Sequence, residues 1–289
     1  MELADYIVNL VGMLLWLSWR GLTAPSGDRP ASLSLAGTLR PTNTRDRRGV
    51  SLLVLLGLLL LGRAAVYRLL APAAGWTPKL DLRYVVPAFP NEDFVAMVTY
   101  SLLSFLRLLS VLYFWMLALN IINRRSGEHH RMHKLIRQHL GLVGRWPWYI
   151  QLVLPLALIA GFWIALAPLL ALLGVTSHIP RLAPLCEQGL LIGGTLYLSL
   201  KYPLPAILLA HLIINYVYFG RSAICDFINL TATKLLAPIR RLPLKVGRVD
   251  FAPVVGAALI LLLLQIVPTH VIPFAERSWH VRLHPLWPL

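Results

Sequence analysis

The chain has 289 residues, of which 57% are hydrophobic and only 13% are charged, and its formal net charge is +15. A soluble domain carries about 25% charged residues, so this composition excludes an ordinary soluble protein. The basic residues lie in loops between apolar runs, which indicates membrane orientation rather than nucleic-acid binding.

The apolar runs predict an all-α integral membrane fold with about six transmembrane helices, because several approach or exceed the ~18–20 residues that cross a bilayer. The N-terminus is acidic and does not resemble a secretory signal, so we expect the first run to be retained. One apolar segment, 186–200, is short for a span and is followed by two prolines; it fits a re-entrant segment, an interfacial helix or the first arm of a long kinked helix. The expected spans are 3–20, 50–67, 94–122, 148–173, 203–227 and 251–272.

The loops between the expected spans alternate in charge. Segments 20–49, 124–145 and 221–249 each hold six Lys or Arg, whereas 63–91 holds four, 174–187 holds one and the C-terminal tail holds two. The positive-inside rule places the three six-charge loops in the cytoplasm. We therefore expect a multi-pass protein of the cell (inner) membrane with both termini on the non-cytoplasmic side.

A parallel repeat is suggested by the three basic loops, each of which has a Gly shortly before or at the returning helix: Gly49, Gly144 and Gly247. Each unit is a span, a basic loop and a returning span, so all units keep the same orientation. The expected domains are a first hairpin repeat at 1–72, a second at 92–174, a third at 185–274 and a tail at 275–289.

The third basic loop contains the most specific motif, "APIRRLP" at Ala237–Pro243 followed by "GRVDFAP" at Gly247–Pro253. This pattern resembles the YggT (YlmG) family of small membrane proteins of bacteria and plastids, most clearly over about 215–267. Relatives are associated with cell-division regions, with plastid and nucleoid distribution and with maturation of a b-type cytochrome, and some with osmotic tolerance and ion uptake. The Asp-containing element is missing or replaced in the first two hairpins.

The chemistry of this motif has two interpretations. Asp250 sits where a helix cap is expected, and Pro238 and Gly247 turn the chain. Arg240, Arg241 and the neighbouring Arg248 either anchor the loop to anionic lipids at the cytoplasmic face or form a docking surface for a partner.

Arg107 lies near the middle of the expected third span, where a charge is costly and usually has a partner. No acidic residue lies deep in any expected span. We interpret Arg107 as structural or as a contact to another membrane protein.

Histidines provide weaker signals. His129 and His133 are four residues apart, but a solvated loop explains them better than a metal site, and His211 with His270 is a weak haem pair. We expect no catalytic residues, no cofactor and no bound metal.

Two functions fit these residues. The first is a non-enzymatic membrane scaffold, assembly factor or accessory subunit that binds and stabilises other membrane complexes. The alternative is an ion or small-solute channel or transporter, which the leucine-rich spans with few polar positions disfavour.

Overall fold

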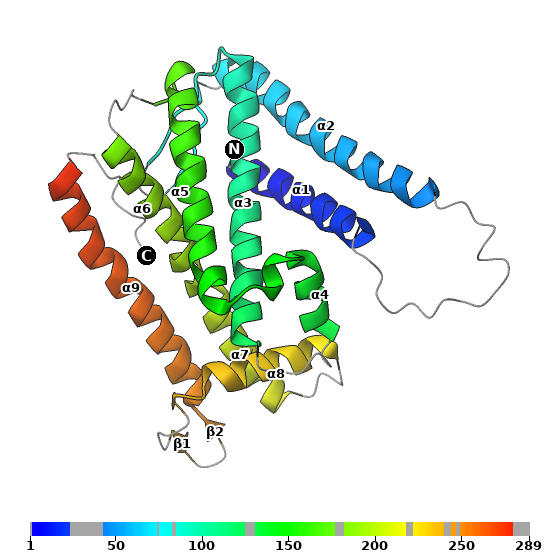
Figure 1. The fold of residues 1–289 in the computed structure, drawn as a ribbon, viewed down its shortest axis with the longest axis vertical. Helices are drawn as coiled ribbons and strands as arrows, with labels where there is room; N and C mark the ends of the chain where they lie inside the picture. Colours follow the sequence, from blue (N-terminus) through cyan, green and yellow to red (C-terminus); the bar gives the residue numbers. More distant parts are fainter. Residues whose placement is uncertain are drawn as a thin grey trace. The chain divides into compact units, whose positions relative to one another are not determined.

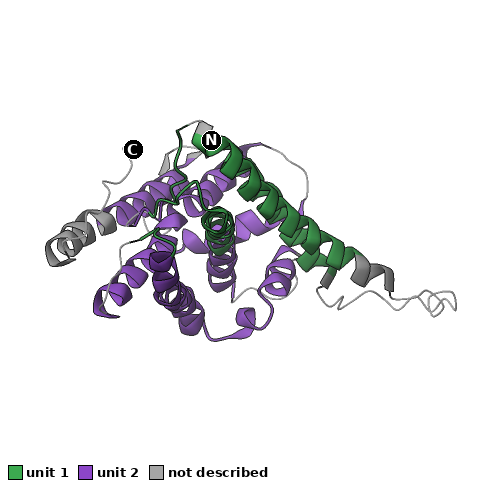
Figure 2. Cartoon of the chain, turned by 90° about the horizontal axis from the view of Figure 1, so that it is seen from above, with its two compact units in different colours: residues 1–80, 87–110, 173–176 green, residues 81–86, 111–172, 177–289 purple. Residues whose placement is uncertain are grey.

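A computed structural model describes residues 2–23, 43–73, 75–82, 85–124, 131–176, 182–217, 222–239, 244–246 and 249–279. Within these ranges the regular secondary structure is helical apart from one two-residue antiparallel ladder and one isolated β-bridge, and turns and extended segments connect the helices. The chain divides into two compact units, coloured separately in Figure 2. Unit 1 comprises residues 1–80, 87–110 and 173–176, and unit 2 comprises residues 81–86, 111–172 and 177–289.

Unit 1 is built from α1 (Glu2–Thr23), α2 (Asn43–Ala73) and the first part of α3 (Phe94–Ile122). Helices α1 and α2 pack side by side. The chain after α2 folds into an antiparallel bridge between Lys79 and Ala88, which returns it to the start of α3. There the carboxylate of Asp93 accepts a hydrogen bond from the backbone N–H of Val95 at 3.0 Å, which satisfies one free amide of the first turn.

Unit 2 contains the remainder of α3, from Val111, and the later elements drawn in Figure 1. Its helices are α4 (Arg131–Leu140), η2 (Val143–Arg145), α5 (Trp148–Leu172), α6 (Leu182–Leu198), η3 (Ser199–Lys201), α7 (Pro203–Tyr216), α8 (Ala223–Leu235) and α9 (Ala252–Trp279). The ladder pairs β1 (Lys245–Val246) with β2 (Val249–Asp250).

Helices α5 and α6 form an antiparallel pair whose contact depends on two glycines. A Cβ added to Gly189 would lie 3.0 Å from the Ala160 Cα, and one added to Gly193 would lie 3.1 Å from the Leu156 carbonyl oxygen. Small residues four apart let two membrane helices approach closely, which strengthens van der Waals packing in a solvent that offers no hydrophobic driving force between helices.

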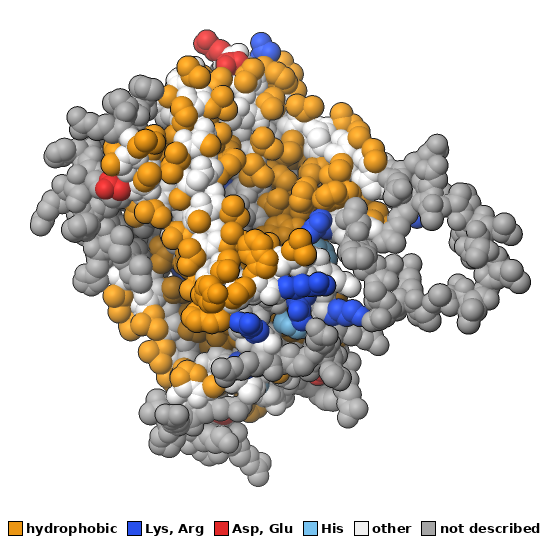
Figure 3. Space-filling model, in the orientation of Figure 1, with side chains coloured by type: hydrophobic (Ala, Val, Ile, Leu, Met, Phe, Trp, Pro, Cys, Tyr) orange, Lys and Arg blue, Asp and Glu red, His pale blue; other side chains and the backbone are white. Residues whose placement is uncertain are grey.

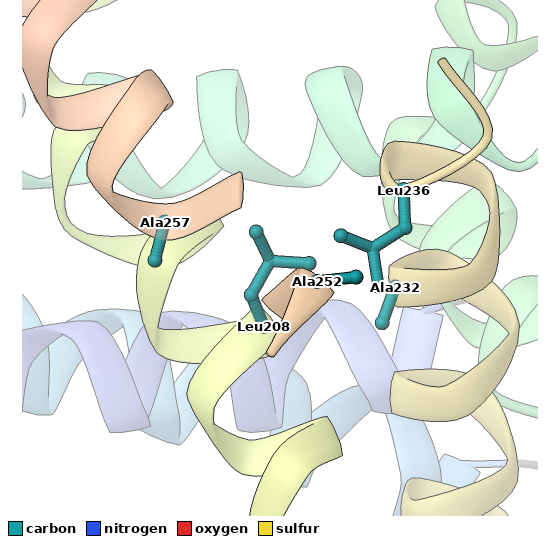
Figure 4. Packing of buried hydrophobic residues seen from close by; sticks show 5 residues of the cluster. All are labelled: Leu208, Ala232, Leu236, Ala252 and Ala257. Atoms are coloured by element: carbon teal, nitrogen blue, oxygen red, sulfur yellow. The ribbon is translucent and has the colours of Figure 1, made fainter. Parts of the chain in front are cut away.

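A small apolar cluster joins α7, α8 and α9. Figure 4 shows Leu208 of α7 between side chains of the other two helices, and the buried members are Leu208, Ala232, Leu236, Ala252 and Ala257. Gly256 of α9 is part of the same contact, because a Cβ there would lie 2.9 Å from Leu236 Cδ2. Small residues therefore set the distance between these helices.

Among the residues that the structure describes, four helical stretches are long and apolar enough to cross a membrane: Arg48–Pro72, Phe94–Ile122, Trp148–Leu172 and Leu182–Tyr216. The apolar part of α9, Ala252–Ile266, is shorter. Apolar side chains of α5 such as Leu158 and Phe162 are exposed, and Figure 3 shows hydrophobic side chains along this helix. The helices are thus compatible with a multi-pass membrane protein, while the six-span and three-hairpin arrangement stays a prediction.

The expected fifth span, 203–227, is interrupted in the structure. Helix α7 ends at Tyr216, Val217 is extended with φ −115° and ψ 127°, and α8 begins only at Ala223. The hydroxyl of Ser222 accepts a hydrogen bond from the backbone N–H of Cys225 at 3.2 Å and caps α8. Because this polar cap starts a new helix, apolar content alone overestimated the length of the span.

The undecided segment 186–200 is helical. It forms most of α6, and the short 3₁₀ turn η3 connects it to α7, so that 182–216 form one helical stretch with a local change of winding. This agrees with the first arm of a long kinked helix. Two prolines near the start of α7, Pro203 and Pro205, account for the break, because proline has no N–H to continue the helical ladder.

Candidate functional site

Asp250 links two helices of unit 2. Its Oδ1 accepts a hydrogen bond from the backbone N–H of Ala252 at 2.9 Å, and its own N–H donates to the Tyr216 hydroxyl at 3.0 Å. Helix α9 begins at Ala252, so the Asp250 carboxylate satisfies a free amide of the first turn from two residues before the helix. This is the capping contact that the sequence predicts. A role for Asp250 in binding a partner stays a prediction.

The remaining motif residues are only partly described. Pro238 is exposed in the turn after α8. Arg240, Arg241, Gly247 and Arg248 lie outside the described residues. The lipid- or partner-binding role of this set stays a prediction.

Arg107 of α3 has an exposed side chain in unit 1. Among the described residues of this unit a buried cation is found at Arg63, whose side chain is 2% exposed. The sequence analysis put Arg63 both inside the expected second span, 50–67, and in the charge count of segment 63–91, and it did not single this residue out. Helix α2 continues to Ala73 and the stretch Arg48–Pro72 is a candidate span, so Arg63 lies within a helix and not in a loop.

Arg63 connects α2 to both neighbouring helices through hydrogen bonds. Its Nε donates to the Ser101 hydroxyl of α3 at 3.0 Å, and one terminal nitrogen donates to the Asn9 Oδ1 of α1 at 2.8 Å. The other terminal nitrogen donates to the Ser101 backbone carbonyl. The guanidinium also lies 5.7 Å from the centre of the Tyr100 ring. Protein groups from two helices, α1 and α3, thus take the place of water around this buried cation of α2.

Asp5 of α1 supplies the opposite charge. Its Oδ1 lies 3.6 Å from the Arg63 Nη1 and accepts a hydrogen bond from the Tyr67 hydroxyl at 2.7 Å. Its Oδ2 accepts from the Tyr100 hydroxyl at 2.9 Å. The Asp5 side chain is 14% exposed and is therefore slightly more accessible to solvent than the Arg63 side chain. Both carboxylate oxygens of Asp5 thus accept a hydrogen bond from a tyrosine hydroxyl.

The two charges and their hydrogen-bonding partners form what we call the Arg63 cluster: Asp5, Asn9, Arg63, Tyr67, Tyr100, Ser101 and Ser104. Asn9 extends the cluster by donating from Nδ2 to the Ser104 hydroxyl at 2.8 Å. The arrangement cross-links α1, α2 and α3 of unit 1 and supports two chemical roles, a structural clamp or a charged site for transport.

A sequence signal for the cluster exists but was missed. Each of its three helices contributes polar residues four positions apart, which places them on one helical face: Asp5 with Asn9, Arg63 with Tyr67, and Tyr100 with Ser104. This spacing occurs in three otherwise apolar runs of the sequence.

Unit 2 has its own buried polar contacts, at the end of α3. Asn120 donates from Nδ2 to the Gln151 Oε1 of α5 at 3.0 Å, and Gln151 donates to the Trp146 carbonyl oxygen at 2.8 Å. Asn123 donates to the Thr231 hydroxyl of α8 at 2.8 Å. Asn120 Nδ2 also donates to the Gly144 carbonyl oxygen at 3.3 Å, so residues of the expected second and third basic loops are held at the end of α3.

The histidines do not form a metal centre among the described residues, where no group of three or more metal-ligating side chains occurs. His133 lies on α4 and is 3% exposed, so the interpretation of a solvated loop is wrong at this position. His211 of α7 has its Nδ1 2.7 Å from the Asn229 Oδ1 of α8 and its Nε2 3.2 Å from Asn215. His129 and the His270 side chain lie outside the described residues.

Comparisons with known proteins give no assignment: no protein-family model, no curated protein and no solved structure matches this chain. The resemblance to the YggT family therefore stays a prediction that rests on the residues of the third basic loop.

Proposed function

We propose that the protein is a non-enzymatic membrane scaffold, assembly factor or accessory subunit that binds and stabilises other membrane protein complexes. In this proposal the protein resides in the cell (inner) membrane, and its basic loops face the cytoplasm. The YggT-like motif of the third basic loop belongs to the partner-binding surface.

The observation that carries the proposal is a packed layer in unit 2 that joins the second and third basic loops. Ile136 and Leu140 of α4 are buried with Leu117 of α3 and Phe227 of α8. We call α4 and α8, with these contacts, the α4–α8 platform. The two loops, separated by the whole of α5 to α7 in sequence, thus contribute to one ordered surface.

An ordered platform is better suited to docking than a mobile loop, because less conformational entropy is lost when a partner binds. Hydrogen bonding adds to this order, since Asn123 ties the end of α3 to Thr231 in the middle of α8. Helix α8 leads directly to the exposed Pro238 at the start of the motif. Figure 3 shows Lys and Arg side chains gathered over α4, which suits an acidic partner surface.

Site-specific photocrosslinking tests this proposal in native membranes. We expect a photoreactive residue at Pro238 to crosslink one defined membrane protein, and one at the exposed Leu158 of α5 to crosslink mainly lipid. Deleting the gene should lower the abundance of the crosslinked complex, and the full-length protein should restore it. Wild-type protein that migrates only as a monomer in mild detergent, with no crosslinked neighbour at Pro238, would refute the proposal.

A channel or transporter is the second candidate, and the Arg63 cluster is the observation that favours it. Ionisable residues inside membrane helices often mark ion or proton pathways. Arg63 and Asp5 are paired within unit 1, and such a pairing is expected both for a transport site and for a structural clamp. Ion flux into liposomes that is present with the wild type and abolished by Arg63→Gln, while Arg107→Gln leaves it intact, would support transport at this cluster and exclude a purely structural pair.

A further inference from the structure

The segment that connects α4 to α5 has a second apolar surface, separate from the one that builds the α4–α8 platform. Ile136 and Leu140 are already buried. Leu135, Leu142, Trp146 and Trp148 are exposed, and the exposed fractions of Leu142 and Trp148 are 74% and 54%. Leu135 lies on α4, Leu142 and Trp146 lie on either side of η2, and Trp148 is the first residue of α5. They are therefore free to contact something outside the chain.

The charge around this surface is positive. Lys134 of α4 and Arg145 of η2 are both exposed. The sequence contains no Asp or Glu between Arg131 and Thr176, so the segment holds no acidic residue of its own. Helix α8, which packs on α4, contributes one carboxylate, the exposed Asp226. The surface thus favours an anionic ligand.

The position of the surface fixes its depth in a membrane. Trp148 is the first residue of α5, one of the stretches long and apolar enough to cross a bilayer. Tryptophan at the end of a transmembrane helix lies at the level of the lipid headgroups, where its ring contacts acyl chains and its N–H meets polar groups. The neighbouring Leu142 and the two cations are then at the same boundary.

We propose that the surface formed by Lys134, Leu135, Leu142, Arg145, Trp146 and Trp148 binds an anionic phospholipid. The guanidinium of Arg145 matches phosphate oxygens through paired N–H donors, and the Lys134 ammonium adds a second positive charge. Leu142 and the indole rings contact the glycerol and upper acyl region. This lipid site does not depend on the proposed scaffold function and differs from the Arg240–Arg241 motif.

Lipid binding by the full-length protein in a neutral detergent tests the proposal. The probes are fluorescent phosphatidylglycerol and fluorescent phosphatidylcholine, titrated separately, with inorganic phosphate as a competitor. We expect the wild type to bind phosphatidylglycerol more tightly. A basic residue near a membrane surface contributes about fivefold in affinity, so Lys134→Gln with Arg145→Gln should weaken phosphatidylglycerol binding about 25-fold and leave phosphatidylcholine binding unchanged.

A matched control removes the same charge elsewhere. Arg68→Gln with Lys79→Gln alters two exposed cations of unit 1 and should preserve the preference for phosphatidylglycerol. Trp146→Ser should weaken binding of both lipids, because it removes apolar contact but no charge. Far-UV circular dichroism confirms that each variant is folded.

Four outcomes would overturn the proposal. The wild type could bind both lipids equally, or the control pair could lose as much affinity as the Lys134 and Arg145 pair. Inorganic phosphate could displace the lipid at the lipid's own concentration, which would identify a free-anion site. Light scattering could show that the double variant converts a dimer to a monomer, which would identify a contact between two copies of this chain.

Discussion

Removing the buried charge of Arg63 should destabilise unit 1. Arg63→Met takes away the hydrogen bonds to Asn9 and Ser101 and the charge opposite Asp5. Breaking one side of a buried ion pair typically costs about 3–5 kcal/mol, because the other charge stays behind. We expect Arg63→Met to lower the free energy of unfolding by about 3 kcal/mol, at the low end of this range. The reason is that Asp5 retains two tyrosine donors and is 14% exposed.

A double-mutant cycle isolates the pair. Asp5→Asn alone leaves Arg63 uncompensated, whereas the double variant leaves no charge, so the two losses should not add, and we expect a coupling energy of about 2 kcal/mol. The free energies come from reversible unfolding of the full-length protein in detergent with increasing sodium dodecyl sulfate, followed by circular dichroism. The same substitution at the exposed Arg68 of α2 is the matched control and should change stability by less than about 1 kcal/mol.

Two results would refute this reasoning. Additive losses in the cycle would show that Arg63 and Asp5 do not interact in the membrane-embedded fold. A loss with Arg68→Met equal to that with Arg63→Met would show that the effect comes from net charge and not from burial.

Two further predictions concern helix contacts of unit 2 and use the same unfolding assay. Gly193→Val should cost about 1–3 kcal/mol, because its Cβ would press on the backbone of α5, whereas Gly194→Val, with no atom within 4 Å of its Cβ, should cost much less; equal losses would contradict close packing of α5 on α6. Asn123→Leu should remove the hydrogen bond to Thr231 and cost at least about 1 kcal/mol, with faster amide hydrogen exchange in α8. Thr233→Val on the same helix serves as the control, and unchanged exchange with Asn123→Leu would count against the contact.

The candidate site was only partly accessible from the sequence. Asp250 was identified correctly as a helix-capping residue because capping is local and depends on neighbours within a few residues. Arg63 lies inside the expected span 50–67 but was not identified as a site residue, because the sequence shows no partner for a charge near the end of an apolar run. Its partner Asp5 lies on another helix, and the sequence does not state which helices pack together.

Composition and hydropathy by themselves determined that the chain is helical and apolar enough for a membrane, because a helix satisfies every backbone polar group within its own segment. They also located the basic segments 124–145 and 221–249, but not the helices α4 and α8 that form within these two segments. Only the tertiary structure decided which polar side chains meet, since that depends on the rotation and pairing of helices. It assembled Asp5, Arg63 and Tyr100 from three helices, and it joined α4 to α8 through Ile136 and Phe227 across a long stretch of sequence.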